Sequence, residues 1–148
     1  MPHLVILYSG NLDKPAQEGG TDMGALCRSL ADTMLAQRDE DGMLVFPPGG
    51  TRVLAYPAAH WAISDGGAAG LAVGKGGDYA FVYMNLRMAR GRSAWVHEQA
   101  GRALEACVKA HFAEQFERRP IGVTLQIDEG AEVFDAKNSS LHPLFHRD

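Results

Sequence analysis

The sequence contains the pattern of strand, helix and strand twice, and this repeat restricts the possible folds more than any other feature. Four segments have the hydrophobic pattern of strands: 3–9, part of 52–63, 79–88 and 121–127. Amphipathic helices are predicted at 21–37 and at 94–116, each between two of these strands. Long helices between strands are typical of parallel crossovers, which are right-handed in almost all proteins. The predicted fold is α/β (α+β), with two tandem β-α-β units in one four-stranded sheet and both helices on one face.

Each predicted helix begins at a residue that is suited to capping it. Thr21 and Ser93 are residues that favour the N-cap position, and we expect them to cap the two helices.

Two helices on one face leave the other face of the sheet uncovered in a monomer. Because an uncovered apolar face is an interaction surface, the sequence predicts an oligomer.

We treat residues 1–148 as a single domain, because the chain has the length of one. The segment 64–78 contains six glycines and is predicted to be a mobile hairpin loop, with 66–77 as a Gly/Ala-rich insertion. Its GLAVGKG stretch does not match a phosphate-binding P-loop. Ala69 stands where that motif needs its first glycine, and Lys75 is not followed by serine or threonine.

The C-terminal segment 132–148 follows neither the helical nor the strand period. It is too apolar for a free tail, and we expect it to pack on its own sheet or on a neighbouring subunit. Its large apolar side chains are Val133, Phe134, Leu141, Leu144 and Phe145.

Several classes of function do not fit the composition. A formal net charge of −4 argues against a nonspecific nucleic-acid binder, and the basic clusters at 87–92 and 117–119 are too short to follow a polyanion. Cys27 and Cys107 lie in apolar helical patterns without the spacing of a zinc site, so no metal is predicted. With no secretory signal and no apolar stretch near about 18 residues, we expect no membrane contact and a cytoplasmic location.

No conventional catalytic signature is present. The sequence lacks a Ser/His/Asp motif such as GxSxG, and its six histidines are scattered. His97 and His111 lie within the second helix pattern, where a surface or satisfied core position is favoured over catalysis. Glu129 and Glu132 are expected in a solvated turn, with a carboxylate site as the alternative.

The chain resembles the 5-carboxymethyl-2-hydroxymuconate isomerase family, in the tautomerase superfamily with an amino-terminal proline. The likeness covers most of the chain in order, apart from longer stretches near 35–45 and 66–77. Its more specific parts are GRS with the helix that follows and the LHPLF ending. The matching stretches are PHLVIL, the arginine after FPPGGT, DYAFVYMNLRMARGRS, EQAGRALEACVKAHFAE and NSSLHPLF.

The resemblance implies a homotrimer assembled through its sheets, with Pro2 as the catalytic base. It also implies that Arg52 and Arg92 hold a small di- or tricarboxylate substrate, and that no cofactor or metal takes part. The GRS motif assigns Arg92, and the alignment that continues from FPPGG assigns Arg52. Arg87 and Arg90 lie close to Arg92 in the sequence, and strand alternation allows Arg87 to point from the opposite face.

Pro2 therefore has two interpretations. A proline is tolerated at the first position of a strand, because no ladder hydrogen bond is lost there. Removal of Met1 would instead make it a terminal secondary amine. An α-amino group titrates near 7.7–8.0, and an apolar wall and adjacent guanidinium groups would lower that pKa toward the range useful to a base. Tyr79, which begins the second unit, offers no terminal amine, so we expect one active site per subunit.

The function predicted on this basis is that of a cofactor-free isomerase in aromatic degradation, of the homoprotocatechuate type. It would move a proton along a carboxylated dienol. Two alternatives remain open from the sequence. One keeps the fold and Pro2 but changes the reaction, to that of a promiscuous tautomerase, a dehalogenase or a decarboxylase-like relative. The other is a non-catalytic oligomer that binds small acids and retains Met1.

Overall fold

The four predicted strands form one mixed sheet. The structure is a computed structural model and describes residues 2–145. The strands are β1 (His3–Ser9), β2 (Arg52–Ala58), β3 (Ala80–Ala89) and β4 (Ile121–Gly130), in the order β2-β1-β3-β4. The β1–β2 and β3–β4 pairs are parallel, and the central β1–β3 pair is antiparallel. Each parallel pair is one β-α-β unit, and the antiparallel pair joins the two units.

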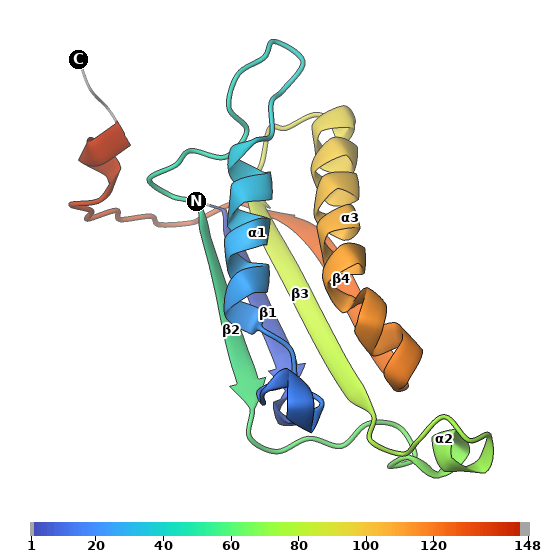
Figure 1. Cartoon of the computed structure of the whole chain (residues 1–148). Coiled ribbons are helices and arrows are strands. Elements are labelled where there is room, and N and C mark those ends of the chain that lie inside the picture. The colour runs from blue at the N-terminus through green and yellow to red at the C-terminus, as the bar shows by residue number, and fades with distance from the viewer. Residues whose placement is uncertain (1, 146–148) are drawn as a thin grey trace.

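Two long helices cover one face of this sheet (Figure 1). Helix α1 (Met23–Leu35) links β1 to β2, and helix α3 (Ala94–Arg118) links β3 to β4. This arrangement confirms the predicted fold of two β-α-β units with both helices on the same side. Among the described residues, no helix combines the length and the apolarity that a membrane crossing requires.

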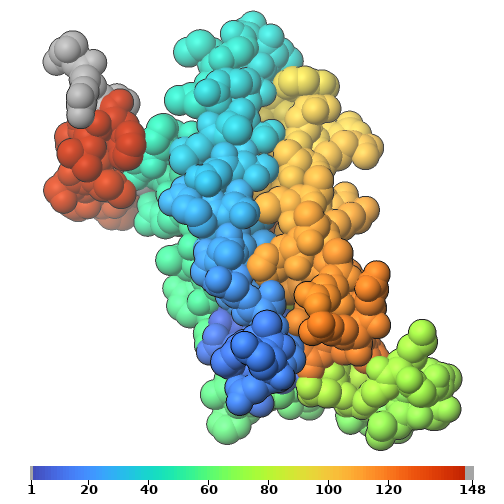
Figure 2. Space-filling model, in the orientation of Figure 1, coloured from blue at the N-terminus to red at the C-terminus, as the bar shows by residue number. Residues whose placement is uncertain are grey.

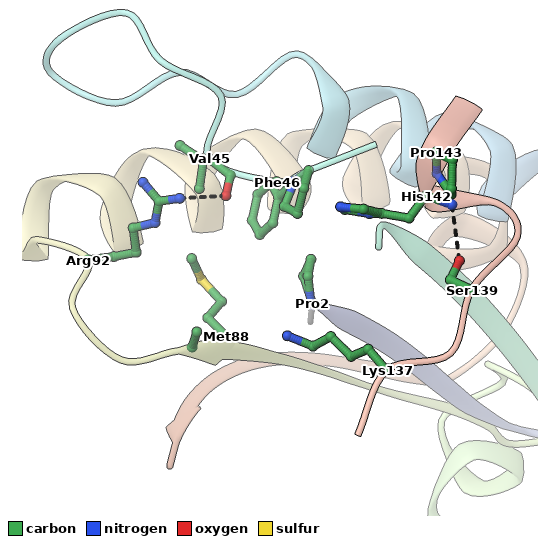
Figure 3. Close-up of a pocket in the computed structure, with 11 residues that line it drawn as sticks. Pro2, Val45, Phe46, Met88, Arg92, Lys137, Ser139, His142 and Pro143 are labelled. Atoms are coloured by element: carbon green, nitrogen blue, oxygen red, sulfur yellow. Dashed lines mark hydrogen bonds between the residues drawn. The ribbon is translucent and has the colours of Figure 1, made fainter. Parts of the chain in front are cut away.

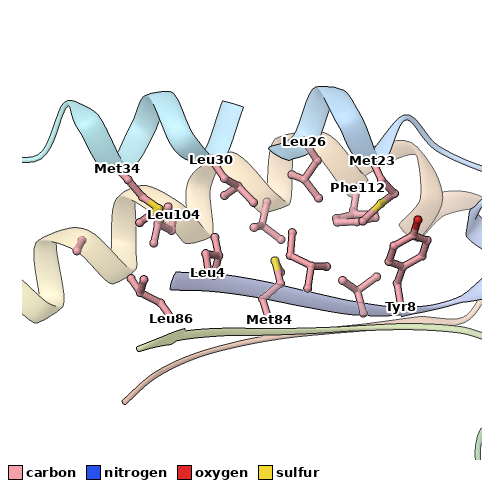
Figure 4. Packing of buried hydrophobic residues seen from close by; sticks show 14 of the residues in the cluster. Leu4, Tyr8, Met23, Leu26, Leu30, Met34, Met84, Leu86, Leu104 and Phe112 are labelled. Carbon is pink, nitrogen blue, oxygen red and sulfur yellow. The ribbon is translucent and has the colours of Figure 1, made fainter. Parts of the chain in front are cut away.

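The core lies between the helices and the inward face of the sheet (Figure 4). Alternate residues of the central strands point toward the helices, as the two-residue period of a strand requires. Burying one such side chain contributes about 1.5–3 kcal/mol. The fully buried residues at the centre of the core are Leu4, Ile6, Met84, Leu86, Leu26, Leu30, Leu104 and Phe112.

One of the two predicted helix caps is correct. Ser93 caps α3, because its side chain accepts a hydrogen bond from the Val96 amide at 3.2 Å. The prediction that Thr21 caps α1 is wrong. Asp22 does so and accepts from the Ala25 amide at 2.9 Å, with its negative charge next to the positive end of the helix dipole. Thr21 Oγ1 instead lies 2.9 Å from Nε2 of His111 in α3.

The glycine-rich segment is not a hairpin loop. Strands β2 and β3 are not paired, because β1 lies between them, and the short helix α2 (Ala68–Ala72) forms within the segment. The Asp65 carboxylate accepts from the Gly67 and Ala69 amides at 3.0 and 2.9 Å and so satisfies the start of this helix. Figure 1 shows α2 at the end of the sheet far from the N-terminus.

The uncovered face of the sheet is present as predicted. It exposes Leu7, Leu54, Tyr56 and Phe81, each between 40 and 50 % accessible. The register explains this common face, since Val5 and Leu7 of β1 lie opposite Leu54 and Tyr56 of β2.

The C-terminal tail crosses the edge of the sheet at which β1 begins and β4 ends, and it projects beside the molecule (Figures 1 and 2). It contains only one short 3-10 turn, His142–Phe145, and residues 146–148 lie outside the described part. The apolar side chains of the tail are largely accessible in the single chain, and packing of the tail on its own sheet or on a neighbouring subunit stays a prediction. The side chains concerned are Val133, Phe134, Leu141, Leu144 and Phe145, all more than half exposed.

The partly buried His111 of α3 predicts that the stability of the fold depends on pH. Burial lowers the pKa of His111 below its ordinary value of 6.5. Below about pH 6.5 the unfolded chain therefore binds a proton that the folded chain resists, and the free energy of unfolding falls as the pH drops. Urea unfolding of His111→Gln should show a shallower decline from about pH 7 to 5 than wild type. His60→Gln, at an exposed loop position, is the matched control, and an unchanged slope in His111→Gln would contradict this assignment.

Candidate active site

Pro2 lines a pocket of about 460 Å³ at the amino end of β1 (Figure 3). Three parts of the chain complete the wall. The segment before β2 contributes Phe46 and its neighbours, the end of β3 and the turn after it contribute Met88 and Arg92, and the tail contributes Lys137 and His142. The pocket therefore joins parts of the chain that are far apart in sequence.

The alternation of β1 explains why Pro2 faces this pocket. Leu4 and Ile6 point toward the helices, and Pro2 precedes Leu4 by two residues, so it lies on the same face. Pro2 is buried, and the adjacent Val45 and Phe46 are almost inaccessible to solvent. The result is an apolar wall around Pro2.

Arg92 is held firmly at the edge of the pocket. Its Nη2 donates to the Val45 carbonyl oxygen at 2.9 Å, and its Nη1 lies 3.6 Å from the Asp39 Oδ2 atom. Gly91, at φ 105°, makes the turn just before it, and the capped start of α3 follows at Ser93. The Arg92 side chain is about one-third exposed, so its charge is accessible from the pocket.

Arg52 lines a different pocket, of about 650 Å³, on the uncovered face of the sheet. The register places Arg52, His3 and Arg87 in one row across three adjacent strands. Arg52 Nε donates to the Gly50 carbonyl oxygen at 3.3 Å. The structure thus brings Pro2 and Arg92 together in one pocket and places Arg52 in the neighbouring pocket. Arg87 lies in that second pocket too, on the uncovered face of the sheet.

Cationic side chains lie close to His3 at the amino end of β1. The pKa of His3 is lowered, first by burial and then by the charges of Arg52 and Arg87. Both causes favour a neutral imidazole. An amine in the same region would experience the same two effects, because burial and neighbouring cations both disfavour its protonated form.

The tail residues of the site were not found from the sequence. Ser139 Oγ accepts from the Leu141 and His142 amides at 3.1 and 3.0 Å and so starts the 3-10 turn. His142 packs against Gly49, where a Cβ atom would overlap the His142 backbone and ring. The only signals were the apolar character of the tail and the NSSLHPLF resemblance, and neither singles out Lys137.

The remaining candidates have structural contacts. His97 Nε2 lies 2.9 Å from Glu129 Oε1, which joins α3 to β4. Glu129 lies in β4 and not in a turn, and Glu132 lines the Arg52 pocket. The described residues contain no group of three His, Cys, Asp or Glu side chains that could hold a metal ion.

Comparison with known proteins identifies the family. The sequence model of the 5-carboxymethyl-2-hydroxymuconate isomerase family matches residues 2–145. The chain belongs to this family. A 5-carboxymethyl-2-hydroxymuconate Delta-isomerase from Escherichia coli is 29 % identical over 145 residues, which cover 98 % of this chain and 99 % of that protein.

Solved structures of the family agree with the fold. A crystal structure of a 5-carboxymethyl-2-hydroxymuconate delta-isomerase has a TM-score of 0.92 at 57 % identity, covering 100 % of this chain and 95 % of that one. A 5-carboxymethyl-2-hydroxymuconate isomerase from Deinococcus radiodurans R1 has a TM-score of 0.77 at 29 % identity, covering 99 % and 95 %. Membership of this family confirms the predicted enzyme class, an isomerase.

Proposed function

We propose that this isomerase moves a proton along a carboxylated dienol of the 5-carboxymethyl-2-hydroxymuconate type, with Pro2 as the base and without a cofactor. The observation that carries the proposal is that Pro2 and Arg92 line one pocket. Family membership supports the substrate class and its place in the degradation of aromatic compounds.

The proposed base is the secondary amine that Pro2 acquires when Met1 is removed. Its buried position and the apolar wall of Val45 and Phe46 favour the uncharged amine. A neutral amine takes one proton from the hydroxyl group or the carbon chain of the dienol and returns it at a distant carbon. The substrate is neither oxidised nor reduced, so the amine, which accepts one proton and returns it, is the only group that the proton transfer requires.

Arg92 is the proposed cation of the Pro2 pocket. It would bind a substrate carboxylate and stabilise the negative charge that develops on the dienolate oxygen. Arg52, which the family resemblance gives as the second cation, faces the neighbouring pocket. In this proposal it contacts only a substrate that extends past Lys137 and Ser139, the residues common to both pockets.

Replacement of the base tests the first part. Pro2→Ala should lower kcat for a 2-hydroxymuconate-type dienol, followed by ultraviolet absorbance, by about 100-fold or more, since that is the usual contribution of a general base. Intact mass must first show the loss of Met1 from wild type. Equal rates in the two proteins, or an active protein that retains Met1, would remove Pro2 from the mechanism.

Replacement of the cation tests the second part. Arg92→Ala should lower kcat/KM about tenfold to 100-fold for a dicarboxylated dienol, because a charge-assisted contact is lost, and much less for a monocarboxylated one. Arg90→Ala is the matched control, since Arg90 is exposed and lines neither pocket. Similar losses on both substrates would exclude Arg92 from carboxylate binding.

The proposed working form is a cytoplasmic homotrimer with one active site per subunit. The uncovered apolar face supports the assembly. The two free cysteines, Cys27 and Cys107, support a reducing compartment such as the cytoplasm. Sedimentation equilibrium should give three times the chain mass of 16.0 kDa. Leu7→Asp, on the uncovered face, should lower that mass, whereas Leu71→Asp, an exposed position in α2, should not. A monomeric wild type would overturn the proposed trimer.

A further inference from the structure

Lys137 lies between the two pockets near the start of β1. It lines the Pro2 pocket and also the Arg52 pocket. Figure 3 shows its side chain running along the pocket floor, with the ammonium group directed toward Pro2. Lys137 is thus a cation that enters the Pro2 pocket from the C-terminal tail.

The ion pair that Lys137 makes is weak and accessible. Its Nζ lies 3.0 Å from Asp135 Oδ2, and the two side chains are 54 and 44 % exposed. Exposed pairs of this kind contribute little to stability, because water screens them and both side chains lose freedom. A carboxylate from outside can therefore replace Asp135 at low cost.

The other cations near the pocket do not provide a second contact for a dicarboxylate. Arg92, held by the Val45 carbonyl and Asp39, is the proposed partner of the first carboxylate. Arg52 and Arg87 lie on the uncovered face of the sheet, across β1 from Pro2. A substrate with two carboxylates needs a second cation on the Pro2 side, and Lys137 lines that side.

We infer that Lys137 binds the second carboxylate of the substrate, and that Asp135 is the internal group it leaves when substrate enters. The inference rests on the proposed function, because it names a residue that would select the dicarboxylate for that reaction. Arg92 and Lys137 approach the pocket from the turn before α3 and from the tail, so they hold the two ends of an extended acid with Pro2 between them.

The two members of the pair give opposite predictions, which separates ligand binding from a structural role. Lys137→Met removes the cation and should weaken binding of a dicarboxylate. Asp135→Asn removes the internal competitor and leaves the cation free, so it should strengthen the same binding. If the pair only held the tail in place, either change would break it and both would act in the same direction.

Isothermal titration calorimetry with adipate, a saturated dicarboxylate, and hexanoate, its monocarboxylate counterpart, makes the test without turnover. Wild type should prefer adipate, and Lys137→Met should lose about tenfold in adipate affinity with little change for hexanoate. Asp135→Asn should bind adipate roughly threefold more tightly, the size of an exposed ion pair. Lys137→Arg should restore most of the preference. Lys109→Met is the matched control, because Lys109 makes a similar exposed pair with Glu105 at 3.1 Å on α3.

Two results would overturn the inference. One is unchanged adipate affinity in Lys137→Met, and the other is an equal loss in Lys137→Met and Asp135→Asn. Pro2→Ala should keep the preference for adipate, since it changes the base and not the cations. An active Pro2→Ala protein that still loses adipate binding on replacement of Lys137 would refute the proposed base and leave the role of Lys137 intact.

Discussion

The antiparallel pairing of β1 with β3 is the interaction on which the rest of the structure depends. It joins the two β-α-β units into one sheet and makes β1 a central strand, with β2 on its other side. A central strand brings the start of the chain into the interior, where Pro2 is buried. An edge strand would have left the same residue in solvent, with no apolar wall beside it.

The pleat of β1 then divides the charges around its amino end. Pro2 points to the helix side, while His3 points to the uncovered side and shares a row with Arg52 and Arg87. Neighbouring residues thus face two pockets of different chemistry. The tail passes between them, so Lys137 and Ser139 belong to both. A residue on this tail can act at the Pro2 pocket without occupying a strand or helix that the core already uses.

The sequence predicts what local periodicity controls. The strands and long helices, the Ser93 cap and the uncovered sheet face all follow from spacing and composition. Helix α1 begins one residue later than periodicity predicts, so Asp22 and not Thr21 caps it. Helix α2 forms because the Asp65 carboxylate accepts hydrogen bonds from amides in a glycine-rich segment. The position of Arg52 depends on the register with His3, and that of Lys137 on the path of a tail without a period. Neither leaves a signal in the local sequence.

The two units are built alike, yet in the proposed mechanism only the first, whose strand follows Pro2, offers a terminal amine. At the start of β3, where the second unit has Tyr79, the backbone is an internal amide and cannot act as a base. The structure fills this position with polar contacts instead. Arg119, almost buried, pairs with Asp78, and Asn11 donates to the Tyr79 carbonyl at 2.8 Å. These contacts tie the end of α3 to the turn before β3. The second strand start therefore has a structural role, and in the proposed mechanism only the first, at Pro2, has a chemical one.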